Sequence, residues 1–295
     1  RSGGPRSMSS RLQDRRVRLL IANRVAEDYK SITSDVTEIT DLRVKFSVKK
    51  SSAKEPNTAE VTISNLSPQR RSALQNKGVK FVLECGYVET GVKQIFQGDV
   101  RQVVHRREGA DWQTEIKSGD GERAFQFARA SESFGAKSSR GDVLRKLVSA
   151  FGLGQGNVSQ VASKLIGKFD HGFVAHGPVS RELDKALAGT GYRWSIQDEQ
   201  VIILKDSEVS GQDVPELTPQ SGLIGSPEFG APLVKGGKPL LTFRCLLNAN
   251  IKPGAHVSIK CERFPLGVAV KCVKVEHSGD THGQDWYTNG EGVTL

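Results

Sequence analysis

The stretch LRVKFSVKK at residues 42–50 alternates apolar with charged or polar side chains. Its apolar residues fall at every second position, which places them on one face of an extended strand: Leu42, Val44, Phe46 and Val48. One buried face and one solvated face are typical of an antiparallel sheet. Five more segments before residue 121 have a similar character: VRLLIAN, AEVTISNL, VKFVLECGYV, KQIFQGDVRQVVHRR and WQTEIKSGD. A spacing of about ten residues per strand predicts a β-barrel or a sandwich.

The period changes after SGDGE at 118–122. In SRGDVLRKLVSAFGLG (139–154) the apolar residues recur at helical spacing, with Ser139 or Asp142 able to cap the start and Gly152 able to end the helix. A second helix is predicted over VSRELDKALAGTG (179–191). It leads into YRWSIQDEQVIIL, which has the pattern of a hairpin around the polar turn QDEQ.

A second β-rich region follows a polar connector, with LLTFRCLL, AHVSIKC, GVAVKCVKVEH and DWYTNGEGVTL as its predicted strands. The predicted class is therefore mainly β with an α+β insertion. The predicted domains are a β unit at 17–124, the insertion at 125–205, and a second β unit with its connector at 206–295. Residues 1–16 are predicted to be an N-terminal extension, of which 1–7 has the composition of an added linker.

Composition narrows the class of protein. No apolar run approaches the ~20 residues of a membrane helix, so we expect a chain that does not span a membrane. Four cysteines without a CxxC pair do not form a disulfide scaffold, although a bridge between Cys261 and Cys272 is geometrically possible. The net charge of +9 suits an acidic partner. No aromatic stacking motif or zinc-finger spacing accompanies the basic clusters, which disfavours a dedicated nucleic-acid reader.

The segment VEHSGDTHGQDWYT (275–288) contains four potential metal ligands within nine positions: His277, Asp280, His282 and Asp285. Their spacing is not that of two histidines on one helix face, and two glycines disfavour a helix. We favour a hairpin loop in which Gly279 and Gly283 adopt positive φ and Asp280 accepts bonds from the turn backbone. A metal site remains the alternative.

Other templates for chemistry fit less well. The sequence has no GxSxG elbow, no P-loop and no GxGxxG fingerprint. A carboxylate pair for glycoside hydrolysis stays open, but Asp99, Asp120 and Glu122 lie beside turn glycines, where closing a turn is the simpler role. The tryptophans at 112, 194 and 286 would form a sugar platform if they clustered on the surface, yet each lies in an alternating strand and is expected in the core.

Six phrases cover nearly the whole chain and resemble, in the same order, the hub proteins of phage tails and baseplates. The first half of the resemblance lies in KEPNTAEVTISNLSP (54–68), CGYVETGVKQIFQGDV (85–100) and DWQTEIKSGDGERAF (111–125). The second lies in ELTPQSGLIGSPE (216–228), LLNANIKPG (246–254) and VKVEHSGDTHGQDWYT (273–288). The chain departs from the family habit at Cys85 and Ala249, where alanine and proline are expected.

This resemblance to the hubs of T-even and Mu-like phages implies two tube-type antiparallel β-barrels flanking the α+β region. It also implies motif positions with structural roles: Pro56, Asn57, Asn65, Gly86, Tyr87, Gly98 and Asp99 in the first barrel, and Pro227, Asn248, Pro253, Gly254, Gly279, Asp280 and Trp286 in the second. By analogy, the asparagines would accept turn conformations, Gly86 and Gly98 would permit bends, and Pro253-Gly254 would fix a tight turn.

The resemblance further implies a non-enzymatic virion protein without a cofactor, assembled in the host cytoplasm as a homotrimer. Six barrels would surround one pore and adapt three-fold to six-fold symmetry. The implied partners are the tail tube protein on one face and the central spike on the other, with a baseplate wedge or tape-measure protein as further candidates. DNA would pass through the pore without sequence-specific binding. Two alternatives are a cell-wall hydrolase using a metal or carboxylate site at 277–285, and a carbohydrate-binding module.

Overall fold

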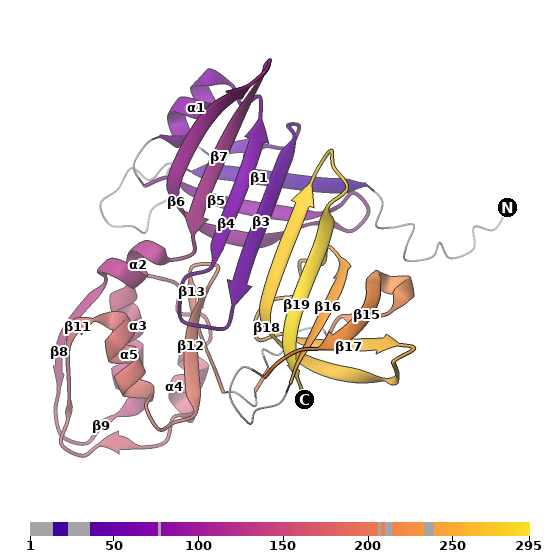
Figure 1. Cartoon of the computed structure of the whole chain (residues 1–295). Coiled ribbons are helices and arrows are strands. Elements are labelled where there is room, and N and C mark those ends of the chain that lie inside the picture. The colour runs from indigo at the N-terminus through magenta and orange to yellow at the C-terminus, as the bar shows by residue number, and fades with distance from the viewer. Residues whose placement is uncertain (1–13, 23–35, 76–77, 206–207, 210–213, 233–238) are drawn as a thin grey trace.

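The computed structural model describes residues 14–22, 36–75, 78–205, 208–209, 214–232 and 239–295. It is dominated by one sheet of thirteen strands, almost all antiparallel, beside a compact helical insertion (Figure 1). The prediction of a mainly β protein with an α+β insertion is confirmed. The predicted linker at 1–7 lies outside the described residues, and the first strand begins at Arg15.

The first β half contains seven strands and one short helix. These are β1 (Arg15–Ala22), β2 (Val36–Ile39), β3 (Val44–Ser51), β4 (Thr58–Ser64), α1 (Pro68–Leu74), β5 (Lys80–Tyr87), β6 (Gly91–Glu108) and β7 (Asp111–Gly119). In β3, buried Val44, Phe46 and Val48 alternate with more exposed residues, as the sequence pattern predicts. They join a core that gathers side chains from β1 through β7.

The insertion folds around its own core. Its elements are α2 (Glu122–Phe127), β8 (Arg129–Phe134), β9 (Ser138–Ser139), α3 (Arg140–Phe151), α4 (Val158–Lys164), β10 (Lys168–Phe169), β11 (Phe173–Pro178), α5 (Val179–Leu187), β12 (Tyr192–Gln197) and β13 (Gln200–Lys205). Ser139 caps α3 by accepting a bond from the Asp142 backbone, and Gly152 ends the helix with φ of 71°. Both helices and the β12–β13 hairpin confirm the sequence prediction.

The second β half contains β14 (Glu216–Leu217), the 3₁₀ helix η2 (Pro219–Ser221), β15 (Leu223–Phe229), β16 (Leu240–Leu246), β17 (His256–Cys261), β18 (Phe264–Asp280) and β19 (Trp286–Thr294). It has a third core. All four cysteines are free thiols, so the possible bridge between Cys261 and Cys272 is absent. Within the described residues, no helix combines the length and apolar character needed to cross a membrane.

The two β halves have the same topology. Strands β3, β4, β7, β6 and β5 follow one another across the first half as β15, β16, β19, β18 and β17 do across the second. The irregularities coincide as well: a register shift after Leu83 matches one after Ile259, and a shift after Val100 matches one after Cys272. The halves are therefore structural duplicates.

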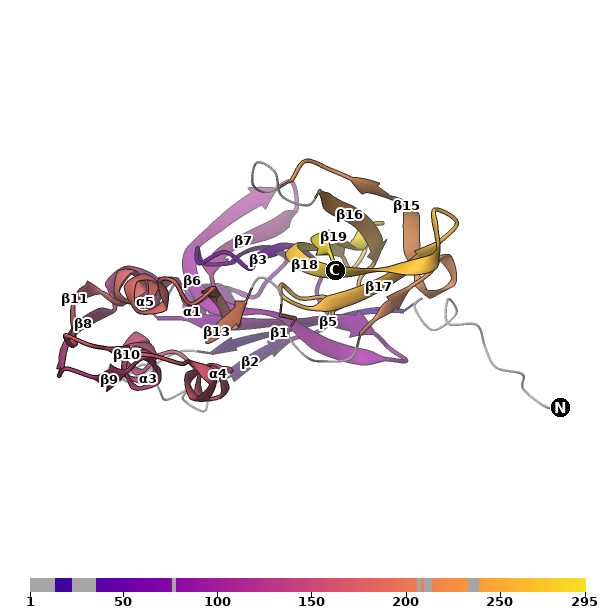
Figure 2. The ribbon, with the colours of Figure 1, turned by 90° about the horizontal axis from the view of Figure 1, so that it is seen from below.

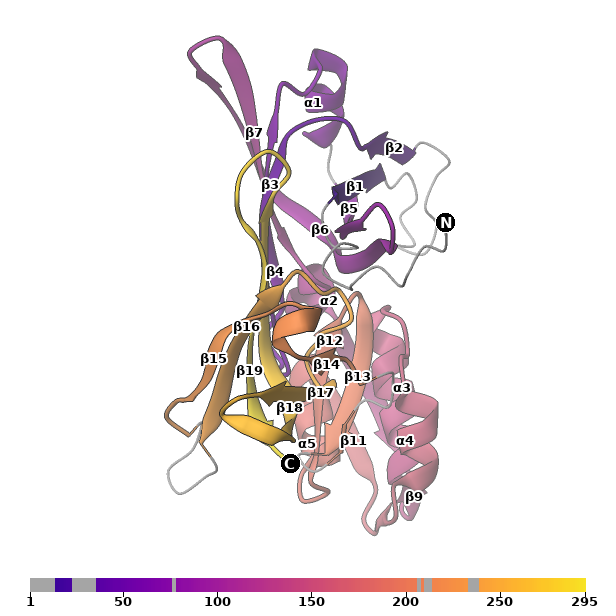
Figure 3. The same ribbon diagram turned by 90° about the vertical axis from the view of Figure 1, so that its right-hand side faces the viewer.

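A single seam joins the halves into one sheet. The last part of β18 pairs antiparallel with β3, from Lys274 opposite Ser51 to Asp280 opposite Lys45. Figure 1 shows the two strands side by side where the colour passes from violet to yellow, and Figure 3 shows the same seam from the side. No local pattern in the sequence indicates this pairing, because the two strands lie more than 200 residues apart in the chain.

Gly279 and Gly283 are glycines for a different reason from the one predicted. Neither has positive φ. A Cβ at Gly279 would lie 2.5 Å from Phe46 Cζ and 2.6 Å from Trp286 Cε3. At Gly283 it would lie 2.7 Å from Asp280 Oδ2. Both positions need glycine because neighbouring side chains approach the backbone closely.

We expect Gly279→Ala to destabilise the fold by about 1–3 kcal/mol, because the added methyl overpacks the aromatic pair at the seam. Urea unfolding of the full chain measures this. Gly135→Ala is the matched control, since nothing lies within 4 Å of its Cβ. Equal stability of the two variants would contradict the tight packing at Gly279.

Candidate functional site

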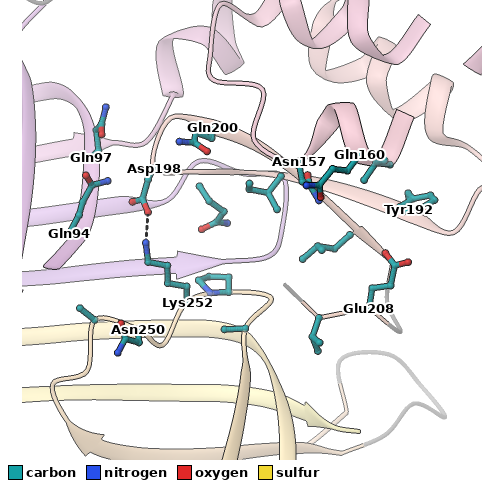
Figure 4. Close-up of a pocket in the computed structure, with 18 of the residues that line it drawn as sticks. Gln94, Gln97, Asn157, Gln160, Tyr192, Asp198, Gln200, Glu208, Asn250 and Lys252 are labelled. Carbon is teal, nitrogen blue, oxygen red and sulfur yellow. Dashed lines mark hydrogen bonds and ion pairs between the residues drawn. The ribbon is translucent and has the colours of Figure 1, made fainter. Parts of the chain in front are cut away.

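The β12–β13 turn of the insertion lies where the insertion contacts both β halves. Asp198 and Glu199 form this turn, both with left-handed backbone at φ of 53° and 59°. Figure 4 shows Asp198 pointing from the insertion toward Lys252 of the second half. The turn therefore places two carboxylates at the junction of the three cores.

Lysines from both β halves neutralise these carboxylates. Lys50 of β3 has a side chain only 1% exposed and lies 2.6 Å from Asp198, which also lies 3.2 Å from Lys252. Lys80 of β5 pairs with Glu199. Burial alone would raise the pKa of Asp198, but the two lysines outweigh it and hold that pKa below its usual range. We name these five residues the charge lock.

Asp120 and Asn57 form hydrogen bonds that stabilise the turn carrying the two carboxylates of the charge lock. Asp120, at the end of β7, accepts the backbone N–H groups of Asp198 and Glu199 at 2.7 and 2.6 Å. Asn57 donates to Asp120 and to the Ile196 carbonyl, and accepts from the Ser51 backbone. Burial raises the pKa of Asp120 to about 6, against the opposing charge of Lys50. Asp120 thus compensates for a turn that two non-glycine residues adopt at a cost.

A groove of about 1480 Å³ opens beside the lock. Its walls come from the insertion and from both β halves, and many of its side chains are amides, including Gln94, Gln97, Asn157 and Asn250 (Figure 4). Viewed from below in Figure 2, the insertion projects to one side of the sheet. The lock therefore fixes the insertion against the sheet along one side of this groove, together with bonds such as those from Lys271 to the Lys205 carbonyl and from Gln197 to the Ser51 carbonyl.

We expect Asp198→Asn to destabilise the chain by about 3 kcal/mol, because the change leaves Lys50 buried without its counter-charge while asparagine still accepts the left-handed turn. Denaturant unfolding measures the loss. Asp184→Asn is the control, since its pair with Lys54 is about half exposed and contributes ~1 kcal/mol or less. A loss no larger than that of the control would contradict a buried lock.

The four candidate metal ligands do not converge. His277 is fully buried, with Nδ1 2.9 Å from Thr288 Oγ1. Asp280 accepts two bonds from Arg43, which lowers its pKa to about 2, and it also accepts the His282 backbone N–H. Among the described residues no group of three potential ligands is close enough to hold a metal. The segment is a β18–β19 hairpin, and neither its metal nor its carboxylate chemistry gains support.

Burial of His277 has a consequence for stability. It lowers the pKa of this imidazole to about 3, and the positive charges of Lys50 and Lys252 act in the same direction. The unfolded chain binds this proton near pH 6.5, whereas the folded chain does not. His277 therefore destabilises the fold progressively as the pH falls below about 6.5.

We expect the wild type to lose about 2 kcal/mol through His277 between pH 7 and pH 5. His277→Gln should lack this loss, because a neutral amide does not titrate and can still bond to Thr288. Thermal unfolding of both proteins across this range checks the difference. Asp120 acts in the opposite direction below pH 6 in both proteins, so the comparison between them cancels it. Parallel pH profiles would contradict the assignment.

The remaining motif positions occupy turns and tight contacts of the two halves. Asn65 has φ of 57°, whereas Asn57 has no positive φ and is buried beside the charge lock, where it bonds to Asp120, so its predicted turn role is wrong. Gly86 and Gly98 lie where a Cβ would collide with the carbonyls of Gly91 and Gly119. Their predicted role as bends is therefore replaced by close approach of backbones.

The other motif positions contribute turns and single hydrogen bonds. Gly254 has φ of 82° in the turn that follows Pro253. The Tyr87 hydroxyl donates to the Leu247 carbonyl, and Asn248 Oδ1 accepts the Asn250 backbone N–H. Three positions lie near strand ends or strand irregularities: Pro56 before β4, Asp99 in β6 and Pro227 in β15. The Asp99 carboxylate lies 4.0 Å from Lys80 of the charge lock, and the Pro227 carbonyl accepts a bond from Arg263.

The tryptophans form no shared platform. Trp286 and Trp194 are buried in different cores, as predicted. Trp112 differs from the prediction, because it is 38% exposed. It lies next to the turn of the β6–β7 hairpin, with the Arg71 guanidinium 4.0 Å from its ring centroid. The three rings do not gather on one surface, so a carbohydrate-binding module gains no support.

The fold of the chain is similar to that of solved phage tail proteins. The 43 kDa tail protein of prophage MuSo2 from Shewanella oneidensis matches with a TM-score of 0.61 at 8% identity, over 93% of this chain and 96% of that one. The tail protein of Neisseria meningitidis MC58 matches with a TM-score of 0.62 at 8% identity, over 95% and 97%.

A third similar structure is an Escherichia coli component of the type VI secretion system, described as structurally similar to T4 bacteriophage tail proteins. It matches with a TM-score of 0.53 at 10% identity, over 86% of this chain and 74% of that one. No family model and no curated protein matches the sequence. The chain therefore has the fold of phage tail and type VI secretion hub-like proteins, which confirms the predicted resemblance at the level of fold.

Proposed function

We propose that the chain is the structural hub of a phage tail or baseplate. Three copies form a ring that joins the hexameric tail tube to the central spike and surrounds the path of the DNA. The observation that carries this proposal is the duplication: each chain holds two equivalent β halves joined edge to edge, so three chains supply six. A ring of this kind matches six-fold symmetry on one face and three-fold symmetry on the other.

The similar structures support this role over an enzyme. Two of them are tail proteins that align over nearly their whole length, so the shared fold is the whole molecule and not an appended module. The charge lock consists of paired, hydrogen-bonded groups that connect units, which is the arrangement of a structural junction. The tail tube and spike proteins are the proposed partners, with a wedge or tape-measure protein beside them. The proposed location is the virion, after assembly in the host cytoplasm.

Native mass spectrometry tests the proposal. We expect a metal-free species of three times 32.1 kDa, and negative-stain images with a central channel. If assembly requires a partner, the trimer should form on addition of tail tube protein. A chain that stays monomeric with tube protein present would contradict the hub. A monomer with stoichiometric zinc and peptidoglycan-cleaving activity would favour the hydrolase alternative.

A further inference from the structure

The two long strands of the duplicated halves differ in what covers their outer parts. Residues 274–280 of β18 pair with β3 on one side, and residues 274–279 pair with β19 on the other. The equivalent residues of β6, 102–108, pair with β7 on one side. No strand in the described part of the chain pairs with them on the other side, since β5 ends its pairing at Asp99. In Figure 3 this β6–β7 hairpin projects beyond the rest of the first half.

Two residue types recur at equivalent positions of these strands. His105 bonds to Thr114 across β6–β7 at 3.1 Å, as His277 bonds to Thr288 across β18–β19 at 2.9 Å. Each pair is directly opposite in its ladder, a fixed number of residues after the matching register shift. The two halves therefore share a histidine–threonine pair as well as their strand order.

Trp112 and Trp286 are equivalent in the same way. Each carbonyl accepts a backbone bond from the residue after the matching strand, Asn65 in one half and Leu247 in the other. Trp286 is 1% exposed because the seam covers it with Phe46 of β3, whereas Trp112 is 38% exposed. A strand equivalent to β3 beside β6 would cover Trp112 as β3 covers one side of Trp286.

That strand exists at the other end of the sheet. β15 is the duplicate of β3, and its only strand partner in the described residues is β16. We infer that β15 of one copy pairs antiparallel with residues 102–108 of β6 in a second copy, repeating the β3–β18 seam between chains. This inference rests on the proposed ring and names the contact that closes it.

The duplication also fixes the register. Glu228 lies opposite Thr242 as Ser47 lies opposite Glu60, and Ser47 faces Ser278 across the seam. Arg106 is the equivalent of Ser278, one residue after the conserved histidine. Glu228 therefore faces Arg106, and Phe229 faces His105.

The chemistry of the two edges agrees with this register. A glutamate directly opposite an arginine is favourable in an antiparallel pair. Ile224 and Phe229 of β15 are 38% and 46% exposed, and the new strand contact would cover them together with Trp112. Two unlike edges make a head-to-tail contact, which closes into a ring when the rotation between copies is a whole fraction of a turn and does not make a symmetric dimer. It also removes both open edges, which a lone β protein must otherwise protect.

Cysteine cross-linking tests the pairing, in the full chain with Cys261→Ser to remove the one partly exposed thiol. Glu228→Cys and Arg106→Cys are placed on separate, co-expressed chains. Directly opposite residues of an antiparallel pair have Cα atoms about 4.5–5.5 Å apart, which suits a disulfide. We expect covalent dimers from the mixture only, and covalent trimers when one chain carries both changes.

Two matched controls bound the result. Ser47→Cys with Ser278→Cys occupies the equivalent register of the intrachain seam and should close within one chain. Glu228→Cys with Gln102→Cys is four residues out of register, about 13 Å along the strand, and should stay uncoupled. If the native mass is that of a trimer but only the out-of-register cysteines cross-link, or neither pair does, the proposed strand pairing is wrong and the ring still stands. A monomeric mass without product would overturn both.

Charge exchange gives an independent readout. Arg106→Glu and Glu228→Arg should each weaken the trimer measured by native mass spectrometry, because each places like charges opposite one another. The double change should restore it. Equal weakening by the double change would contradict the pairing of these two residues.

Discussion

The pairing of β18 with β3 is the contact on which the rest of the molecule depends. An unpaired strand edge exposes a row of backbone donors and acceptors, and two separate β halves would each expose one here. The seam satisfies both edges with one ladder and converts two sheets into one. It also buries Trp286, His277 and Gly279 beneath β3, so the core of the first half is completed by side chains of the second.

The charge lock adds orientation to this connection. Buried ion pairs contribute little net stability, because desolvation of both charges offsets their attraction. Their contribution is to orientation: Lys50, Lys80 and Lys252 come from different strands and loops, and all three donate to the carboxylates of one turn. The insertion is thereby held at a fixed angle to a sheet with which it shares no strand.

Local patterns in the sequence predicted the elements well, and non-local contacts poorly. Alternation at 42–50, the Ser139 cap and the β12–β13 turn depend on neighbours in the chain, so residue type alone indicates them. Gly279 was assigned to a turn because glycine signals both positive φ and close approach, and only the distant Phe46 distinguishes them. Asn57 gives no signal of its role, because its partners lie far along the chain: Asp120 directly after β7 and Ile196 in the insertion.

The duplication of the β halves is not visible as a repeat in the sequence, and the reason is physical. His105 precedes its tryptophan by seven residues and His277 by nine, since the second hairpin loop is two residues longer, so no constant period links them. Almost everything else has diverged: one half has added β1, β2 and α1, and the other has a bulged β15. What both halves retain is the strand order, two register shifts, a histidine–threonine pair and a tryptophan. These features shape the edge of one long strand. In the second half that edge receives β3 of the same chain, and in the proposed ring the equivalent edge of the first half receives β15 of a second copy.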